Sequence, residues 1–85
     1  MDVTEILAQR EKTHGDFTDH ARITQQLKTT LRELRPEGWH KLDDCQKETL
    51  DMIAHKIGRV LAGDPNVKDH WDDIAGYATL ISQRL

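Results

Sequence analysis

The fold of this chain is decided by residues 44–62, DCQKETLDMIAHKIGRVLA, and by residues 63–85, GDPNVKDHWDDIAGYATLISQRL. Apolar residues recur at helical spacing on both sides of Gly63-Asp64-Pro65, and a helix does not continue through that break. We expect one helix from about residue 44 to 62. A second should begin at Asn66, with Asp69 three residues on, and continue to near Leu85. The two form an antiparallel helical hairpin.

Two further helices are predicted before this hairpin. The first covers about Val3 to Thr13 and ends at His14-Gly15, where glycine can adopt a positive φ. The second begins after Asp16, the expected N-cap, with Asp19 at the third helical position. It continues to about Leu34 and ends before Pro36.

A loop is expected between the second helix and the hairpin, from Arg35 to Lys41, because this segment contains Pro36, Gly38 and Trp39. The next helix is then capped by Asp43, with Leu42 before it and Gln46 at the third helical position. The fold class is therefore all-α, a small bundle of about four helices with a C-terminal antiparallel hairpin. Residues 1–85 form a single helical domain.

The chain is short for a stable monomer. Of 85 residues, 36% are hydrophobic, roughly 31 side chains for a core. A domain of this size hides only about 60% of its unfolded surface, so a homo-oligomer is expected.

Two helix faces support this expectation. A core stripe is predicted on the third helix, and the last helix is apolar over roughly 220°, as at an oligomer interface or in the central helix of a bundle. Gly58 and Gly76 suggest close backbone approach. The predicted core residues of the third helix are Leu50, Ile53, Ala54, Ile57, Val60 and Leu61.

Composition excludes several classes of protein. Twelve basic and 15 acidic residues give a net charge of -3, so no broad basic face for double-stranded nucleic acid is expected. The single cysteine, Cys45, cannot form an internal disulfide, and neither a signal peptide nor a membrane-spanning stretch is present. A cytoplasmic protein without membrane contact is predicted. The five histidines lack the local spacing of a metal site, so no metal and no cofactor is expected.

Two acidic groups leave an enzymatic alternative open. Glu48 and Asp51 on one helix, and Asp69, Asp72 and Asp73 on the next, could bind Mg²⁺ and a triphosphate. An antiparallel hairpin places the two groups at opposite ends, although they could meet across subunits. The alternative is that Asp69, Asp72 and Asp73 are acids of a first helical turn, where the helix dipole favours them, and that Asp51 lies in solvent.

Cationic residues gather in the predicted structure at the hairpin turn. Lys56 and Arg59 precede the turn, and Lys68 and His70 follow it, beside a helix N-terminus that suits a phosphate. Alternatively, Lys56 and Arg59 form ion pairs with the acids of the last helix.

The second helix and the turn before it offer further ligand contacts. Thr24 and Lys28 lie one turn apart on the apolar side, with Arg22 nearby, and need polar partners there. At the turn, His14 supplies an imidazole and Phe17 a ring that could stack on a base. The alternative is a capped helix junction with Phe17 in the core.

Four stretches of the chain form a specific combination of motifs: Lys-Thr-His-Gly-Asp-Phe at 12–17, His-Lys-Ile-Gly-Arg at 55–59, Gly-Asp-Pro at 63–65 and His-Trp-Asp-Asp-Ile-Ala-Gly-Tyr-Ala at 70–78. This combination resembles a family of short helical proteins encoded by phages and prophages. The chain is also similar to phage anti-CBASS proteins, which act as sponges for cyclic oligonucleotide signals. The Asp-Ile-Ala-Gly-Tyr segment resembles MazG-like nucleotide pyrophosphatase domains, but the acidic pattern departs from theirs.

The sponge resemblance implies a hexamer that holds cyclic di- or trinucleotides between protomers without cleaving them, in the cytoplasm of an infected bacterial host. It implies phosphate contacts from Arg59 and from Thr24, Arg22 or Lys28. The candidate ligand-binding residues are then Arg59, Thr24, Lys28, Arg22, Lys56, His14 and Phe17, with no catalytic residue. The alternatives are a Mg²⁺-dependent MazG-like pyrophosphatase and a non-catalytic phage interaction protein.

Overall fold

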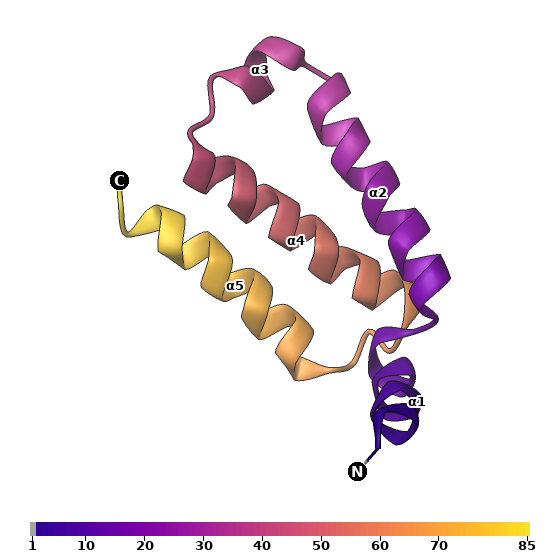
Figure 1. Ribbon diagram of the computed structural model, residues 1–85. Helices are drawn as coiled ribbons and strands as arrows, with labels where there is room; N and C mark the ends of the chain where they lie inside the picture. Colours follow the sequence, from indigo (N-terminus) through magenta and orange to yellow (C-terminus); the bar gives the residue numbers. More distant parts are fainter. Residues whose placement is uncertain (1) are drawn as a thin grey trace.

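The computed structural model describes residues 2–85, and within that range it contains five helices and no strand (Figure 1). The predicted all-α class is confirmed. The helices are α1 (Val3–His14), α2 (Phe17–Glu33), α3 (Pro36–His40), α4 (Asp44–Ala62) and α5 (Lys68–Ser82).

Local capping explains where the longer helices begin. The Asp16 carboxylate accepts a hydrogen bond of 3.0 Å from the backbone N–H of Asp19, so α2 begins where the sequence predicts. Asp43 and Gln46 form a complete capping box at α4, with bonds of 2.8 and 3.0 Å. Gly15 ends α1 with φ +82°, as expected for a residue without a side chain.

The predicted loop between α2 and α4 is wrong, because Pro36 begins the short helix α3. Proline favours the first position of a helix, where its missing N–H costs no hydrogen bond. The Arg32 guanidinium lies 4.4 Å from the centre of the Trp39 ring, a cation–π contact that joins α3 to α2. The described chain therefore has one helix more than the four expected.

The predicted cap of the last helix is also wrong. α5 begins at Lys68 after Val67, and no side chain caps it. The backbone N–H of Asn66 instead donates 2.9 Å to the Asp64 carboxylate, and this bond shapes the preceding turn.

The three long helices form a layer with α4 in the middle, between α2 and α5, while α1 projects from one end (Figure 1). α2 approaches α4 closely at Gly58, where a Cβ would overlap Thr24 Oγ1 and lie 2.7 Å from His20 Cδ2. Close approach at Gly58 is thus confirmed. The same expectation for Gly76 is wrong, since a Cβ there meets no atom within 4 Å in the described structure.

This layer encloses almost no apolar core. Among the described residues, Ala54 is the one buried apolar side chain, whereas His20, Thr24, Lys56 and His70 are buried polar ones. The predicted core stripe on α4 is confirmed in part: Ala54 is buried, and Ile53 and Val60 are half-buried. It is wrong for Leu50, Ile57 and Leu61, which are left exposed because α2 and α5 pack against opposite sides of α4. None of the helices described for residues 2–85 has the length and apolar character needed to span a membrane.

Candidate functional site

A pocket lies where α1, the turn into α2 and the second half of α4 meet. Its volume of about 420 Å³ falls within the range of roughly 300 to 1,000 Å³ typical of small-molecule sites. Helix α1 contributes an outer wall, although none of its own residues is buried. The pocket is lined by Leu7, Arg10, Glu11, His14, Gly15, Asp16, Phe17, His20, His55 and Arg59.

Backbone contacts hold the turn of the pocket against the end of α4. The N–H of Asp64 donates 3.1 Å to the carbonyl oxygen of Thr13. A Cβ on Gly15 would overlap the carbonyl of Ala62, so only glycine permits this approach. The two segments are therefore fixed relative to each other without any large side chain between them.

Four histidines gather around this junction. His20 Nε2 donates 3.1 Å to the carbonyl oxygen of His55, which ties α2 to α4. His70 Nε2 donates 3.0 Å to the carbonyl oxygen of Thr13, which ties α5 to the end of α1. The rings of His14 and His70 also meet edge to face, with centroids 5.3 Å apart. The histidines that seemed unrelated in the sequence are thus structural neighbours.

Sequence reasoning missed this cluster, although one signal for it was present. His20 and Thr24 are one turn apart on α2, and both face Gly58 across the contact with α4. A glycine in the middle of a helix marks close approach, so the residues opposite it could have been identified as buried.

Arg59 is the most unusual group in the pocket wall. Its Nε is buried and has no hydrogen-bond partner among the described residues, and no described carboxylate lies within salt-bridge distance of its guanidinium. Burial lowers the pKa of Arg59, and an arginine remains charged in spite of such a shift. A buried cationic donor without an acceptor is the kind of group that a bound anion satisfies.

Two imidazoles of the pocket, those of His14 and His55, have lowered pKa values and are neutral at pH 7. Burial, with a smaller contribution from Arg59, lowers the pKa of His14. Burial, followed by His20 and Arg59, lowers the pKa of His55 to about 4. Arg59 and Arg10 therefore supply positive charge to the pocket, while His14 and His55 supply uncharged donors and acceptors.

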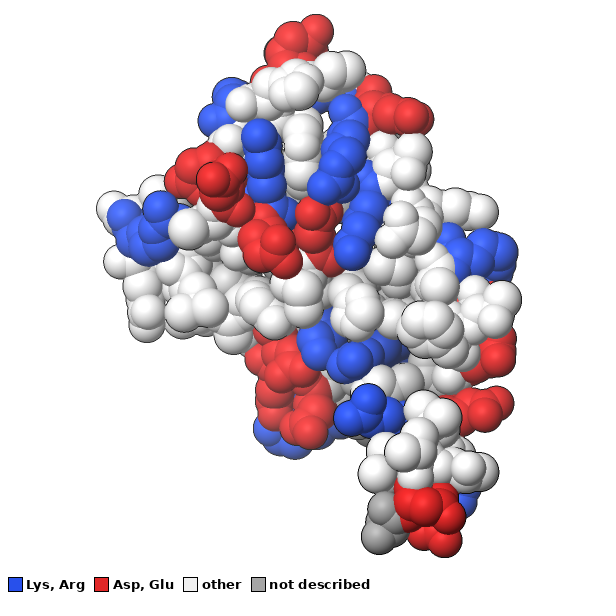
Figure 2. All heavy atoms as spheres, in the orientation of Figure 1, with Lys and Arg blue, Asp and Glu red and all other residues white. Residues whose placement is uncertain are grey.

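The same face of the molecule carries many charged side chains. Figure 2 shows lysine and arginine atoms in the middle of this face, above the projecting α1, with aspartate and glutamate atoms beside them. Glu11 and Asp16 also line the pocket, so its rim has both signs of charge. Phe17 lies at this rim and is 78% exposed, which contradicts its alternative placement in a core.

Of the predicted ligand-binding residues, the structure brings His14, Phe17 and Arg59 together in one pocket. Lys56 lies close in sequence to Arg59 but is buried toward α5, where its Nζ is 2.9 Å from the Asp73 carboxylate. The hydrogen bond from Lys56 is the main cause of the lowered pKa of Asp73. The ion-pair alternative is therefore confirmed for Lys56 and is wrong for Arg59.

The predicted residues on α2 lie apart from the pocket lining. Thr24 is buried at the contact with α4, and its hydroxyl has no partner among the described residues. Arg22 is exposed and forms a 2.7 Å ion pair with Asp19. Lys28 is half-buried farther along α2 and does not line the pocket.

Three of the five acidic residues of the enzymatic alternative are paired with cations at separate places. Asp51 receives two hydrogen bonds, of 3.0 and 2.7 Å, from Arg32, and this pairing raises the pKa of Arg32. Asp72 pairs with Lys68 at 2.6 Å. Over residues 2–85, no three histidine, cysteine, aspartate or glutamate side chains are grouped so that they could hold a metal ion.

Comparison with known proteins identifies the family of this chain. No curated protein and no solved structure matches it. One family model, described as a domain of unknown function (DUF6378), matches residues 3–85. The match includes every helix of the structure. The chain therefore belongs to the DUF6378 family.

Proposed function

We propose that this protein binds cyclic di- or trinucleotides and sequesters them without cleavage. In a bacterial cell infected by a phage, this binding suppresses CBASS-type immune signalling. The observation that carries the proposal is the Arg59 guanidinium in the pocket wall, whose buried Nε has no protein acceptor.

Arg59 favours a phosphate over an uncharged ligand. A charged donor removed from water without an acceptor is costly, and a phosphate oxygen supplies a charge-assisted hydrogen bond. Arg10 lines the same pocket and adds a second positive charge. His14 is held neutral by its lowered pKa and can donate or accept a hydrogen bond without adding charge.

Phe17 favours a ligand that also has an aromatic base. Its ring is exposed at the rim, and a base can stack on such a ring at a gain of about 1 to 3 kcal/mol. The pocket of about 420 Å³ is small for a whole cyclic oligonucleotide. One ligand would then be shared by the pockets of neighbouring copies. The proposed assembly is a hexamer, and in each protomer α4 and α5 form an antiparallel hairpin.

The arrangement of the carboxylates supports sequestration of the ligand rather than its cleavage. A metal-assisted hydrolase needs several acidic side chains that converge on one point. Asp51 and Asp73 are instead engaged by Arg32 and Lys56, on different sides of α4. The pocket itself contains cationic and neutral donors, which are the groups that bind phosphates.

Equilibrium dialysis of the purified protein against cyclic di- and trinucleotides tests the proposal. After dialysis the protein is denatured and the released nucleotide is separated by chromatography. Retention of a ligand that is recovered intact supports sequestration. A linear product would instead indicate an enzyme, and no retention would indicate an interaction protein; either result overturns the proposal.

Two arginine variants provide the matched comparison. Arg59→Ala should weaken retention by roughly tenfold or more, because a buried charged hydrogen bond is lost. Arg22→Ala should leave retention unchanged, because Arg22 is exposed and paired with Asp19 away from the pocket. Circular dichroism shows whether each variant keeps its helices, and Arg59→Lys, which keeps the charge, should restore part of the binding.

A further inference from the structure

We propose that a second copy of this chain packs on the apolar face of the molecule, opposite the pocket. The apolar face is defined by three residues of α4 and two of α5: Leu50, Ile57, Leu61, Trp71 and Ala78. The inference does not depend on the proposed ligand, because the pocket and this face lie on opposite sides of the helical layer.

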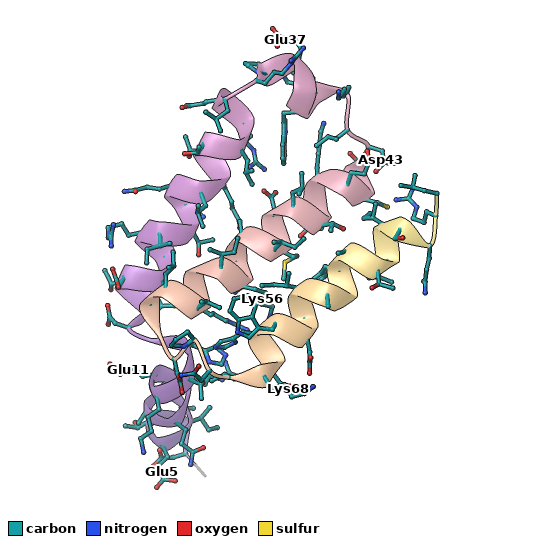
Figure 3. The ribbon with its side chains drawn as sticks, turned by 180° about the vertical axis from the view of Figure 1, so that it is seen from behind. Glu5, Glu11, Glu37, Asp43, Lys56 and Lys68 are labelled. Carbon is teal, nitrogen blue, oxygen red and sulfur yellow. The ribbon has the colours of Figure 1, made fainter. Side chains whose placement is uncertain are left out.

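Helix geometry places these residues on one side of the layer. At about 100° per residue, Leu50, Ile57 and Leu61 lie within an arc of about 40° on α4, roughly opposite Arg59. On α5, Trp71 and Ala78 differ by about 20°. A groove between the two helices confirms that they share a side, because Leu50 and Ile53 line it together with Ala78 and Ile81. Figure 3 shows the back of the view in Figure 1, with Lys56 between α4 and α5 and Lys68 at the beginning of α5.

The apolar face is exposed and lacks charge. Leu61 is 64% exposed and Trp71 is 53% exposed. The groove between α4 and α5 contains no charged residue; its remaining lining residues are Leu42, Gln46 and Thr49. On the opposite side of these helices, the corresponding groove contains Glu48 and Arg84. The groove on the apolar side is thus free of charged residues, whereas the groove on the other side is not.

The surface area of the chain indicates how much of it a partner should cover. A folded monomer of 9.8 kDa is expected to expose about 5,200 Å², whereas this structure exposes 6159 Å². The excess of about 1,000 Å² is close to the roughly 800 Å² that each partner buries in a stable protein complex. The radius of gyration, 14.5 Å, also exceeds the value of about 12 Å for a compact chain of this length.

The absence of charge favours a second copy over a different protein. In a two-fold dimer each residue near the axis meets its own equivalent, so a charged face would oppose like charges. Recognition of a different protein usually relies on complementary charge, which the apolar face does not offer. Two copies can instead cover each other with Leu61, Ile57 and Trp71 at the centre.

Sedimentation equilibrium of the full chain over a wide range of concentrations tests this inference. The wild-type protein should reach at least twice the chain mass of 9.8 kDa as the concentration rises, and six times that mass if such pairs assemble into the proposed hexamer. Leu61→Lys should remove the pairing and lower the fitted mass by at least half, because it places an unpaired charge in the interface. Leu80→Lys is the matched control: Leu80 is 59% exposed but lies on the opposite side of α5, and the dimer should persist.

Thermal unfolding gives a second measurement that does not require a variant to fold. If the native protein is a dimer, its unfolding midpoint rises with protein concentration. A wild-type chain that stays at the mass of one copy, with a midpoint independent of concentration, would overturn the inference. So would a dimer that Leu80→Lys dissociates and Leu61→Lys does not, because the charged side would then form the interface.

Discussion

Two regions of the molecule, the junction around the pocket and the apolar face, differ in the kind of side chain that they remove from water. At the junction, the residues removed from water are polar, among them His20 and His70, and they are held by hydrogen bonds to backbone carbonyls. On the apolar face, Leu61 and Trp71 remain in water although they are the residues that normally form a core. The polar interior therefore belongs to the candidate site, whereas a second copy would cover the exposed apolar residues in the proposed dimer.

The difference also concerns how tightly each region is packed. Backbone segments touch at the junction, where neither Gly15 nor Gly58 has room for a side chain. The apolar face has no neighbour in the single chain. Changes at the junction should consequently affect folding most, whereas changes on the apolar face should affect assembly.

The largest effect is expected from Gly15→Ala. Its φ of +82° is unfavourable for alanine, and the new Cβ would overlap the carbonyl of Ala62. We expect a loss of about 3 kcal/mol or more in the free energy of unfolding, measured by urea denaturation with circular dichroism.

Gly38→Ala provides the control for this change. A Cβ at Gly38 would lie 3.4 Å from side-chain carbons of Arg35, an ordinary contact, and its stability should change little. If both variants are equally stable, the turn does not contact the end of α4 as described.

The second largest effect concerns the pH dependence of the junction. The pKa of His55 is about 4 in the folded chain and 6.5 in the reference state, so between these values the unfolded chain binds more protons. This contribution to stability is fully present above pH 6.5 and is lost as the pH falls toward 4. The lowered pKa of His14 acts in the same direction. We expect the free energy of unfolding to fall by about 1 to 2 kcal/mol over this range. This is less than the full pKa shift would give, because water screens the partly exposed ring.

Urea denaturation at several pH values between 7 and 4, at constant ionic strength, checks this prediction. Replacement of His55 by asparagine should flatten the slope in that range. The carboxylates with lowered pKa, such as Asp73, lose their contribution only at lower pH, below their usual value of 3.8. A wild-type stability that is constant from pH 7 to 4 would contradict the burial of His55 beside Arg59.

Local features of the fold could be predicted from the sequence because they depend on neighbouring residues. Asp16 and Asp43 cap their helices through side chains that reach three residues ahead, and both were identified. The short helix at Pro36 was not, since its residues resemble a turn and Trp39 is held there by a contact with Arg32. α5 lacks a side-chain cap because its N-cap residue is Val67, whose side chain cannot accept a hydrogen bond.

The candidate site could be predicted only in part for the same reason. His14 and Phe17 belong to one turn, so their proximity could be predicted. Their meeting with Arg59 could not, because it depends on the tertiary contact between that turn and the end of α4. The positions of His20 and His55 depend on which sides of α2 and α4 meet. The apolar pattern of α4 predicted the burial of Ala54 correctly, but the larger Leu50 and Ile57 of the same stripe stay exposed, because α2 approaches α4 on the side of Gly58.

A smaller effect is expected from two neighbouring acids on α5. Asp73 accepts a salt bridge from the buried Lys56, whereas Asp72 pairs with Lys68, which is fully accessible. Asp73→Asn leaves a buried ammonium without its carboxylate, so it should lower the thermal unfolding midpoint clearly more than Asp72→Asn does. Scanning calorimetry of both variants checks this difference, and equal midpoints would mean that Lys56 finds another acceptor.

The smallest effect, and the only stabilising one, is expected from Gly76→Ala. Gly76 lies inside α5 with open space around its Cα, and alanine is favoured over glycine in a helix by about 1 kcal/mol. Its neighbours Asp72, Asp73, Tyr77 and Leu80 belong to the charged side, away from the apolar face. If copies meet only through the apolar face, the variant should gain stability by urea denaturation and keep the wild-type mass in sedimentation. A loss of stability together with a lower mass would show that another chain approaches Gly76 closely. Glycine is favoured over alanine inside a helix only where a neighbouring atom leaves no room for a methyl group.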